Sequence, residues 1–144
     1  MHRRPVGRSR VLAAIGALTA VVGCFLPWWT FGGRNGLPVL SGTGFDSMGI
    51  VVFAAAIATL ALVTLPYASE RPVSADRWSS YAIIAIVGWL GFGYRVVDLA
   101  TQGAFSFDEP ADVVTHIPGL WLAGIGLAIL ARATYEMLQE PRLR

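Results

Sequence analysis

Two ionisable residues, Arg95 and Asp98, stand three positions apart near the end of an otherwise apolar stretch. Residues at this spacing are neighbours on a helix, so the guanidinium and the carboxylate can pair. Charged groups within a membrane span usually face the bundle interior, which makes the pair a candidate site for an ion, a proton or an anionic ligand. The alternative, which we favour, is a structural salt bridge, because Arg95 lies only about 7.5 Å beyond the span centre and can reach the interface.

A second group of ionisable residues follows this stretch: Asp108, Glu109, Asp112 and His116. If the segment is helical, Asp112 and His116 lie one turn apart. Carboxylates and an imidazole together could bind a divalent metal ion. The spacing matches no specific metal motif and acidic loops are commonly just solvated, so we expect neither a metal nor a cofactor.

The motifs of the common catalytic sites are missing from the sequence. It has no nucleophile elbow, P-loop, His-Glu-x-x-His or dinucleotide-binding fingerprint. The single cysteine, Cys24, excludes an intrachain disulfide and a Cys-x-x-Cys redox centre. We therefore expect a protein that is not an enzyme.

Four stretches without any charged residue must position these groups: 11–33, 47–69, 78–94 and 113–131. Each is close to the ~20 residues that a helix needs to cross a hydrocarbon core of about 30 Å. The apolar fraction of 55% and the mean hydropathy of +0.59 exceed those of ordinary soluble domains. A large soluble core is the alternative, and it fails because soluble helices alternate apolar and polar faces.

The predicted fold is an all-α membrane protein, a four-helix transmembrane bundle with a short extracytoplasmic β-hairpin between the first two helices. Pro27 and Pro66 are expected to end helices, and Pro118 to begin one. Asp46 or Ser47 is a plausible N-cap. The single domain spans residues 1–144, with helices at about 11–27, 47–65, 79–101 and 118–140 and the hairpin at about 28–44.

The hairpin prediction rests on the Asn-Gly pair at 35–36, because a type I′ turn needs positive φ at both central residues. Pairing outward from the turn places Phe31 opposite Leu40 and Trp29 opposite Gly42. Trp29, Phe31 and Leu40 would then share an apolar face, which is a candidate docking face because a lone hairpin is marginal in water. The alternative is an irregular glycine-rich loop.

All eleven basic residues are Arg, and they gather at the ends of the apolar runs. The positive-inside rule then places both termini in the cytoplasm. This distribution suits lipid headgroups and argues against nucleic acid as a partner. We expect a multi-pass protein of the bacterial inner (cell) membrane whose partners are the lipid bilayer and either another membrane protein or a second copy.

The first apolar run also has features of a targeting segment. Basic residues precede it, as in a secretory signal, and residues 21–24 resemble a lipobox in which Cys24 would be lipidated after cleavage. Apolar residues follow Cys24 directly, whereas a mature lipoprotein usually starts with polar residues. We therefore expect an uncleaved helix.

Small residues recur at spacings of three and four in each predicted helix, and this puts each set on one face. Such faces let membrane helices approach closely, so we expect a close-packed bundle, although an Ala/Gly-rich chain can also produce them by chance. The sets are Ala13, Gly16, Ala20, Gly23; Ala54, Ala58, Ala61; Gly88, Gly91; and Gly119, Ala123, Gly126.

The run Gly-Cys-Phe-Leu-Pro-Trp-Trp at 23–29, followed by Ser-Gly-Thr-Gly at 41–44, resembles small four-span membrane proteins of unknown function common in actinobacteria. This resemblance covers the first half of the chain and implies no activity. The layout is also similar to claudin-like proteins, but their first-loop Gly-Leu-Trp with paired cysteines is missing here, so a barrier function is not implied.

Three functions follow as hypotheses. The favoured one is a non-catalytic accessory or assembly protein that binds another membrane protein through its outer cap and helix faces. The second is a small transporter or a lipid- or ligand-binding protein that uses Arg95 and Asp98. The weakest is a membrane enzyme that uses the acidic segment and His116. A closed bundle with an exposed aromatic patch favours the first, and a deep polar cavity reaching Arg95 favours the second.

Overall fold

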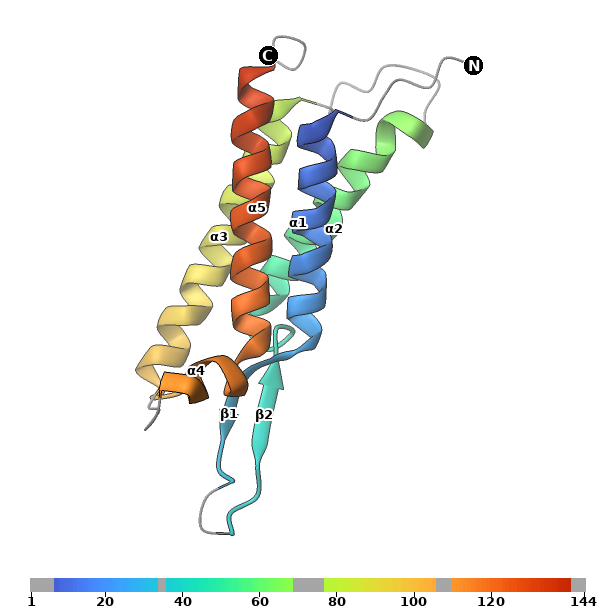
Figure 1. Ribbon diagram of the computed structural model, residues 1–144. Coiled ribbons are helices and arrows are strands. Elements are labelled where there is room, and N and C mark those ends of the chain that lie inside the picture. Colours follow the sequence, from blue (N-terminus) through green and yellow to red (C-terminus); the bar gives the residue numbers. More distant parts are fainter. Residues whose placement is uncertain (1–6, 34–35, 69–76, 106–109, 141–144) are drawn as a thin grey trace.

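A computed structural model describes residues 7–33, 36–68, 77–105 and 110–140. Figure 1 shows four long helices side by side in a bundle, with a β-hairpin and a short helix at one end. All four long helices are long and apolar enough to cross a membrane, in agreement with the sequence prediction. The elements are α1 (Arg8–Phe25), β1 (Pro27–Phe31), β2 (Leu40–Thr43), α2 (Gly49–Ala68), α3 (Trp78–Thr101), α4 (Pro110–His116) and α5 (Pro118–Gln139).

Proline sets the end of α1 but not the end of α2. Leu26, which precedes Pro27, has an extended backbone with ψ of 161°, as expected for a residue before proline. The prediction that Pro66 stops the second helix is wrong, since α2 continues through Pro66 to Ala68. Only two helical residues follow Pro66, so the proline lies within the last turn of α2.

The predicted caps of the second helix are also wrong. α2 begins only at Gly49, and neither Asp46 nor Ser47 occupies its N-cap position. Ser47 has a left-handed φ of 54° and lies in a tight turn in which the Gly49 amide donates to the Asp46 carbonyl. A Cβ at position 49 would clash with the Gly44 carbonyl, so this turn requires glycine.

The closest helix pair is α1 and α5, which run antiparallel with their small residues facing each other. A Cβ on Gly23 would lie 2.5 Å from the Ala123 amide nitrogen, and one on Gly126 would lie 2.5 Å from that of Ala20. The last three residues of the α1 stripe have the same spacing of four and then three residues as the α5 stripe, which brings backbone against backbone along the seam. The predicted close packing therefore holds for the first and last long helices.

The small residues of the other two helices behave differently from each other. Gly88 and Gly91 of α3 pack closely, since a Cβ on Gly91 would lie 2.7 Å from Val51 Cβ of α2. On α2 the prediction is wrong, because Ala54 and Ala61 are exposed. The helix has small residues on two adjacent faces, and the buried one carries Val52, Ala55, Ala56, Thr59 and Val63.

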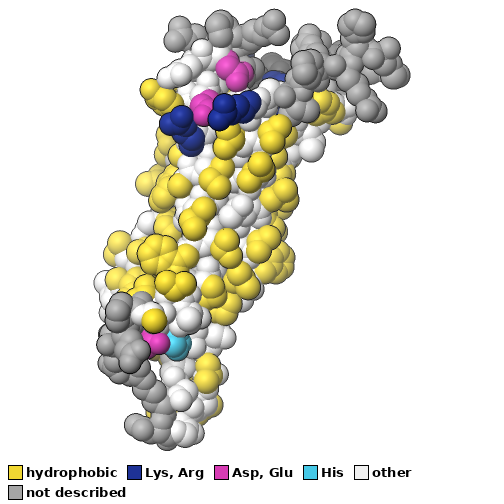
Figure 2. All heavy atoms as spheres, viewed as in Figure 1, with side chains coloured by type: hydrophobic (Ala, Val, Ile, Leu, Met, Phe, Trp, Pro, Cys, Tyr) yellow, Lys and Arg dark blue, Asp and Glu magenta, His cyan; other side chains and the backbone are white. Residues whose placement is uncertain are grey.

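The outer surface of the long helices is apolar. Figure 2 shows hydrophobic side chains over the middle of the bundle, with arginine side chains near the end that lies opposite the hairpin. Large apolar side chains are more than half exposed on every long helix, among them Leu18, Ile50, Leu90 and Ile125. A surface of this kind suits hydrocarbon, whereas a soluble protein rarely exposes so large an apolar patch.

Candidate functional site at the hairpin end

The two strands pair in the register that the sequence predicts. Trp29 lies opposite Gly42 and Phe31 opposite Leu40, in an antiparallel ladder. The predicted turn at 35–36 lies partly outside the described residues, and Gly36 has the positive φ, 76°, that such a turn needs. The hairpin between the first two helices is therefore present.

A bulge between Pro27 and Trp29 anchors the hairpin in the bundle. The ladder has no partner for Trp28, and the extra residue of a bulge can turn its side chain away from the sheet. Trp28 is fully buried, its Nε1 donates to the Gly23 carbonyl over 2.9 Å, and its ring meets Phe92 edge-on. The strand is thus held to both α1 and α3 by one side chain.

Trp29 belongs largely to the protein's own packing. Its half-buried ring and the Asp46 carboxylate both lie against Gly42, where an added Cβ would clash with each. The ring also lies 5.4 Å from that of Phe31. Of the three predicted docking residues, Trp29 therefore offers the least free surface.

The free apolar surface of the hairpin, here called the hairpin patch, consists of Phe31, Leu37, Val39 and Leu40. Phe31 is 37% exposed, and the other three side chains are 62% to 64% exposed. Figure 1 shows that the strands extend well beyond the ends of the helices. The sequence prediction missed Leu37 and Val39, and the signal that could have found them is the apolar run Leu-Pro-Val-Leu at 37–40.

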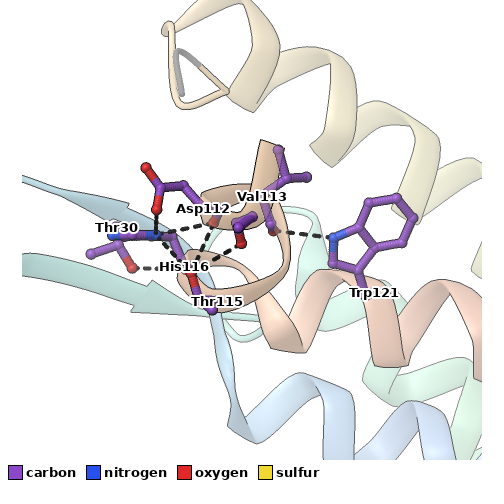
Figure 3. Close-up of polar contacts among 7 residues, drawn as sticks. Thr30, Asp112, Val113, Thr115, His116 and Trp121 are labelled. Atoms are coloured by element: carbon purple, nitrogen blue, oxygen red, sulfur yellow. Dashed lines mark hydrogen bonds and ion pairs between the residues drawn. The ribbon is translucent and has the colours of Figure 1, made fainter. Parts of the chain in front are cut away.

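The short helix α4 lies across this end of the bundle and is tied to its neighbours by two side-chain donors (Figure 3). The Thr30 hydroxyl of β1 donates to the His116 carbonyl over 2.9 Å. The Trp121 indole of α5 donates to the Val113 carbonyl over 3.2 Å. The hairpin, α4 and α5 therefore form one connected cap.

Asp112 and His116 lie one helical turn apart on α4, as their spacing predicts. His116 Nδ1 is 3.8 Å from Asp112 Oδ1 and 3.0 Å from the Asp112 carbonyl oxygen. Asp108 and Glu109 lie outside the described residues. Within the described part of the chain, no group of three or more His, Cys, Asp or Glu residues could hold a metal ion.

Arg95 and Asp98 are in contact on α3, through Arg95 Nη1 and Asp98 Oδ2. The other carboxylate oxygen accepts a hydrogen bond from Gln102 Nε2 over 2.9 Å. Arg95 is only 5% exposed, and its Nε has no hydrogen-bond partner among the described residues. The Asp98 carboxylate thus neutralises the buried guanidinium of Arg95 within the same helix. The hydrogen bond from Gln102 holds that carboxylate in position.

A cavity at this end of the bundle is lined by apolar side chains. A groove of about 550 Å³ lies between α3 and α5, and Arg95 and Asp98 are not among its lining residues. The arrangement therefore combines an exposed apolar hairpin with a locally neutralised ion pair. Comparison of the chain with known protein families, with curated proteins and with solved structures finds no match.

Proposed function

We propose that this protein is a non-catalytic integral membrane protein of the accessory or assembly type, which binds another membrane protein through its hairpin patch. The observation that carries the proposal is the position of Phe31, Leu37, Val39 and Leu40. These apolar side chains lie on the strands and the connecting segment of the hairpin, which extends beyond the helix ends, where a membrane protein meets water. Aromatic and aliphatic groups at such positions commonly anchor interfaces.

The backbone of the hairpin adds a second reason. The sheet has only two strands, so each strand has one edge without a neighbouring strand in the described structure. Free strand edges readily accept a strand from another chain. A partner can therefore gain backbone hydrogen bonds and apolar contacts at the same place.

The placement in the membrane is part of the proposal. We infer a bacterial inner membrane location with both termini cytoplasmic and the hairpin outside. The support is that Arg8, Arg10, Arg77 and Arg132 all lie at or near helix ends away from the hairpin. This orientation leaves the hairpin patch facing a partner on the external side.

A second candidate function, lipid or ligand binding at the ion pair, is favoured by one observation. The Arg95 Nε is buried and lacks a partner among the described residues. Against it, Asp98 already neutralises the guanidinium, and the groove nearby has an almost entirely apolar lining among the described residues, which would not lead a charged ligand to the pair. We therefore place docking first.

The docking proposal can be tested in the full chain with a photo-crosslinking residue placed at position 37. Membranes of the native cell are irradiated, and crosslinked products of the wild type are compared with those of Phe31→Ser/Leu40→Ser. We expect one discrete product that the double variant loses, because the two apolar side chains that pair across the strands are replaced by polar ones. Val114→Ser is the matched control, since Val114 is 62% exposed at the same end but lies on α4.

The thermal unfolding temperature in mild detergent separates docking from self-packing. Both variants should unfold close to the wild-type temperature, because the altered side chains of the double variant lie outside the core of the bundle and Val114 is exposed. Unfolding of the double variant at a clearly lower temperature would mean that the patch packs on its own protein. An unchanged crosslinked product in the double variant would also contradict docking through this patch.

A further inference from the structure

An apolar groove, here called the lateral groove, opens between α3 and α5 near the hairpin end. Its volume is about 550 Å³. Figure 1 shows α3 leaning away from α5 toward this end, with α4 crossing below the gap. The groove has apolar lining residues from all three helices, including Trp89 and Phe92 of α3, Val113 of α4, and Leu120 and Ile125 of α5.

The depth of the lateral groove follows from the exposure of its lining. Ile117 and Leu120 at its base are 2% and 7% exposed. Trp89, Trp121 and Ile125 also line it, yet they are 39% to 52% exposed, so they form a rim on the bundle surface. The groove is therefore a recess that is open at the side of the bundle.

The walls of the groove are held in place by specific contacts. Gly124 lets the Phe92 ring rest on the α5 backbone, because a Cβ at position 124 would lie 3.1 Å from Phe92 Cζ. The bond from Trp121 Nε1 to the Val113 carbonyl fixes α4 over the hairpin end of the recess. The groove is thus covered toward the hairpin and open sideways.

We propose that the lateral groove binds one acyl chain of a membrane phospholipid, which enters sideways from the bilayer. The inference rests on the membrane placement proposed above and not on the hairpin patch. A site on two helices of spanning length faces hydrocarbon, and its described lining is almost entirely apolar, so a polar ligand finds few hydrogen-bond partners there. The surrounding medium itself therefore supplies the occupant.

The length of the groove also fits an acyl chain. On the α5 side its lining runs from Ile117, the residue that precedes the helix, to Ala128, and eleven residues of helical rise correspond to about 16 Å. Half of a hydrocarbon core of about 30 Å is about 15 Å, the depth of one leaflet. Because the groove reaches the hairpin end, the phospholipid belongs to the leaflet on the hairpin side.

Binding here depends on packing, because the alternative environment of the chain is equally apolar. Lipid tails are as apolar as leucine, so contact with a preformed, aromatic-walled recess provides the gain. A side chain that fills the recess should therefore abolish binding. Gly124→Leu does this from the α5 wall, and Ala128→Leu does it from an exposed position where no core packing changes.

The test uses the full chain in mild detergent, with palmitoyl-oleoyl phosphatidylglycerol as the added lipid and native mass spectrometry as the readout. We expect the wild type to hold one phospholipid per chain and both groove variants to lose at least ten-fold in bound lipid. Ala61→Leu is the control, because Ala61 is exposed on α2 away from the groove, and it should bind as the wild type does. Thermal unfolding verifies that Ala128→Leu remains folded.

Three outcomes would overturn the proposal: no phospholipid on the wild type, wild-type binding by Ala128→Leu, or a lipid-free dimer that this substitution dissociates. The last outcome would show that a helix of a second copy fills the groove. The hairpin variant Phe31→Ser/Leu40→Ser should keep its lipid. The docking function and the acyl-chain site can thus fail independently.

Discussion

Gly16 of α1 and Gly126 of α5 bring two helix backbones into direct contact. A Cβ on Gly16 would lie 2.8 Å from the Gly126 carbonyl oxygen, and a Cβ on Gly126 would lie 2.6 Å from that of Gly16. The relationship is reciprocal, so neither helix can accept a side chain there unless the other moves. The seam between α1 and α5 is therefore the least adaptable part of the bundle.

Gly126→Ala should destabilise the protein. The new methyl group would meet the backbone of Ala20, and overpacking of this kind typically costs about 1–3 kcal/mol. Gly93→Ala is the control, because a Cβ there meets nothing within 4 Å and alanine favours the helix. Thermal unfolding in detergent measures both, and equal losses would show that the seam is not tightly packed.

The Arg95–Asp98 pair should show energetic coupling. Arg95→Ala and Asp98→Asn each leave one group without its charged partner, and each should cost about 1–3 kcal/mol. The double variant should lose clearly less than the sum, because no unpaired charge remains. Unfolding free energies of the four proteins measure this coupling. Additive losses would exclude it and would revive a separate ligand-binding role for Arg95.

Thr30→Val should loosen the connection between the hairpin and α4. The substitution keeps the shape of the side chain but removes the bond to the His116 carbonyl, which is worth about 1 kcal/mol. Hydrogen exchange should become faster in α4 and β1 while α1 remains protected. Thr19→Val is the control, since Thr19 bonds within its own helix to the Ile15 carbonyl. Unchanged exchange in α4 would mean that other contacts hold the cap.

The orientation predicts the behaviour of reporter fusions. A reporter that fluoresces only in the cytoplasm should be bright when it is fused to the C-terminus, because arginine concentrates at that end of the bundle. A reporter active only outside should work when it is inserted at Gly36, in the hairpin turn. The reverse pattern in expressed fusions would invert the topology and place the hairpin patch inside.

The sequence predicted the features that depend on long uncharged runs or on strict backbone requirements. The four spanning helices follow from the absence of charge over about twenty residues. The register of Phe31 opposite Leu40 was predicted from the Asn-Gly pair in the sequence, since a turn type fixes the pairing around it. The contact between Arg95 and Asp98 follows from helical spacing alone.

Tertiary packing decided the features that the sequence did not predict. Alternation along the strand puts Trp28 and Trp29 on opposite faces, but only the bulge sends Trp28 into the bundle core. Alanines lie on two adjacent faces of α2, and the position of α1 determines which face is buried. Ala56 is on the buried face and packs with Ala17 and Ala20. The lateral groove has no sequence signature, because it arises from the divergence of two helices.

The partnership of α1 with α5 has a consequence for the order of assembly. Gly16 and Gly126 are 110 residues apart, so α1 is synthesised long before its principal neighbour. During that interval the small-residue face of α1 lacks the helix that covers it in the folded bundle. Closure of the bundle is therefore a late, long-range event that follows translation of α5. A chain that stalls before α5 would leave the small-residue face of α1 uncovered, where quality control could recognise it.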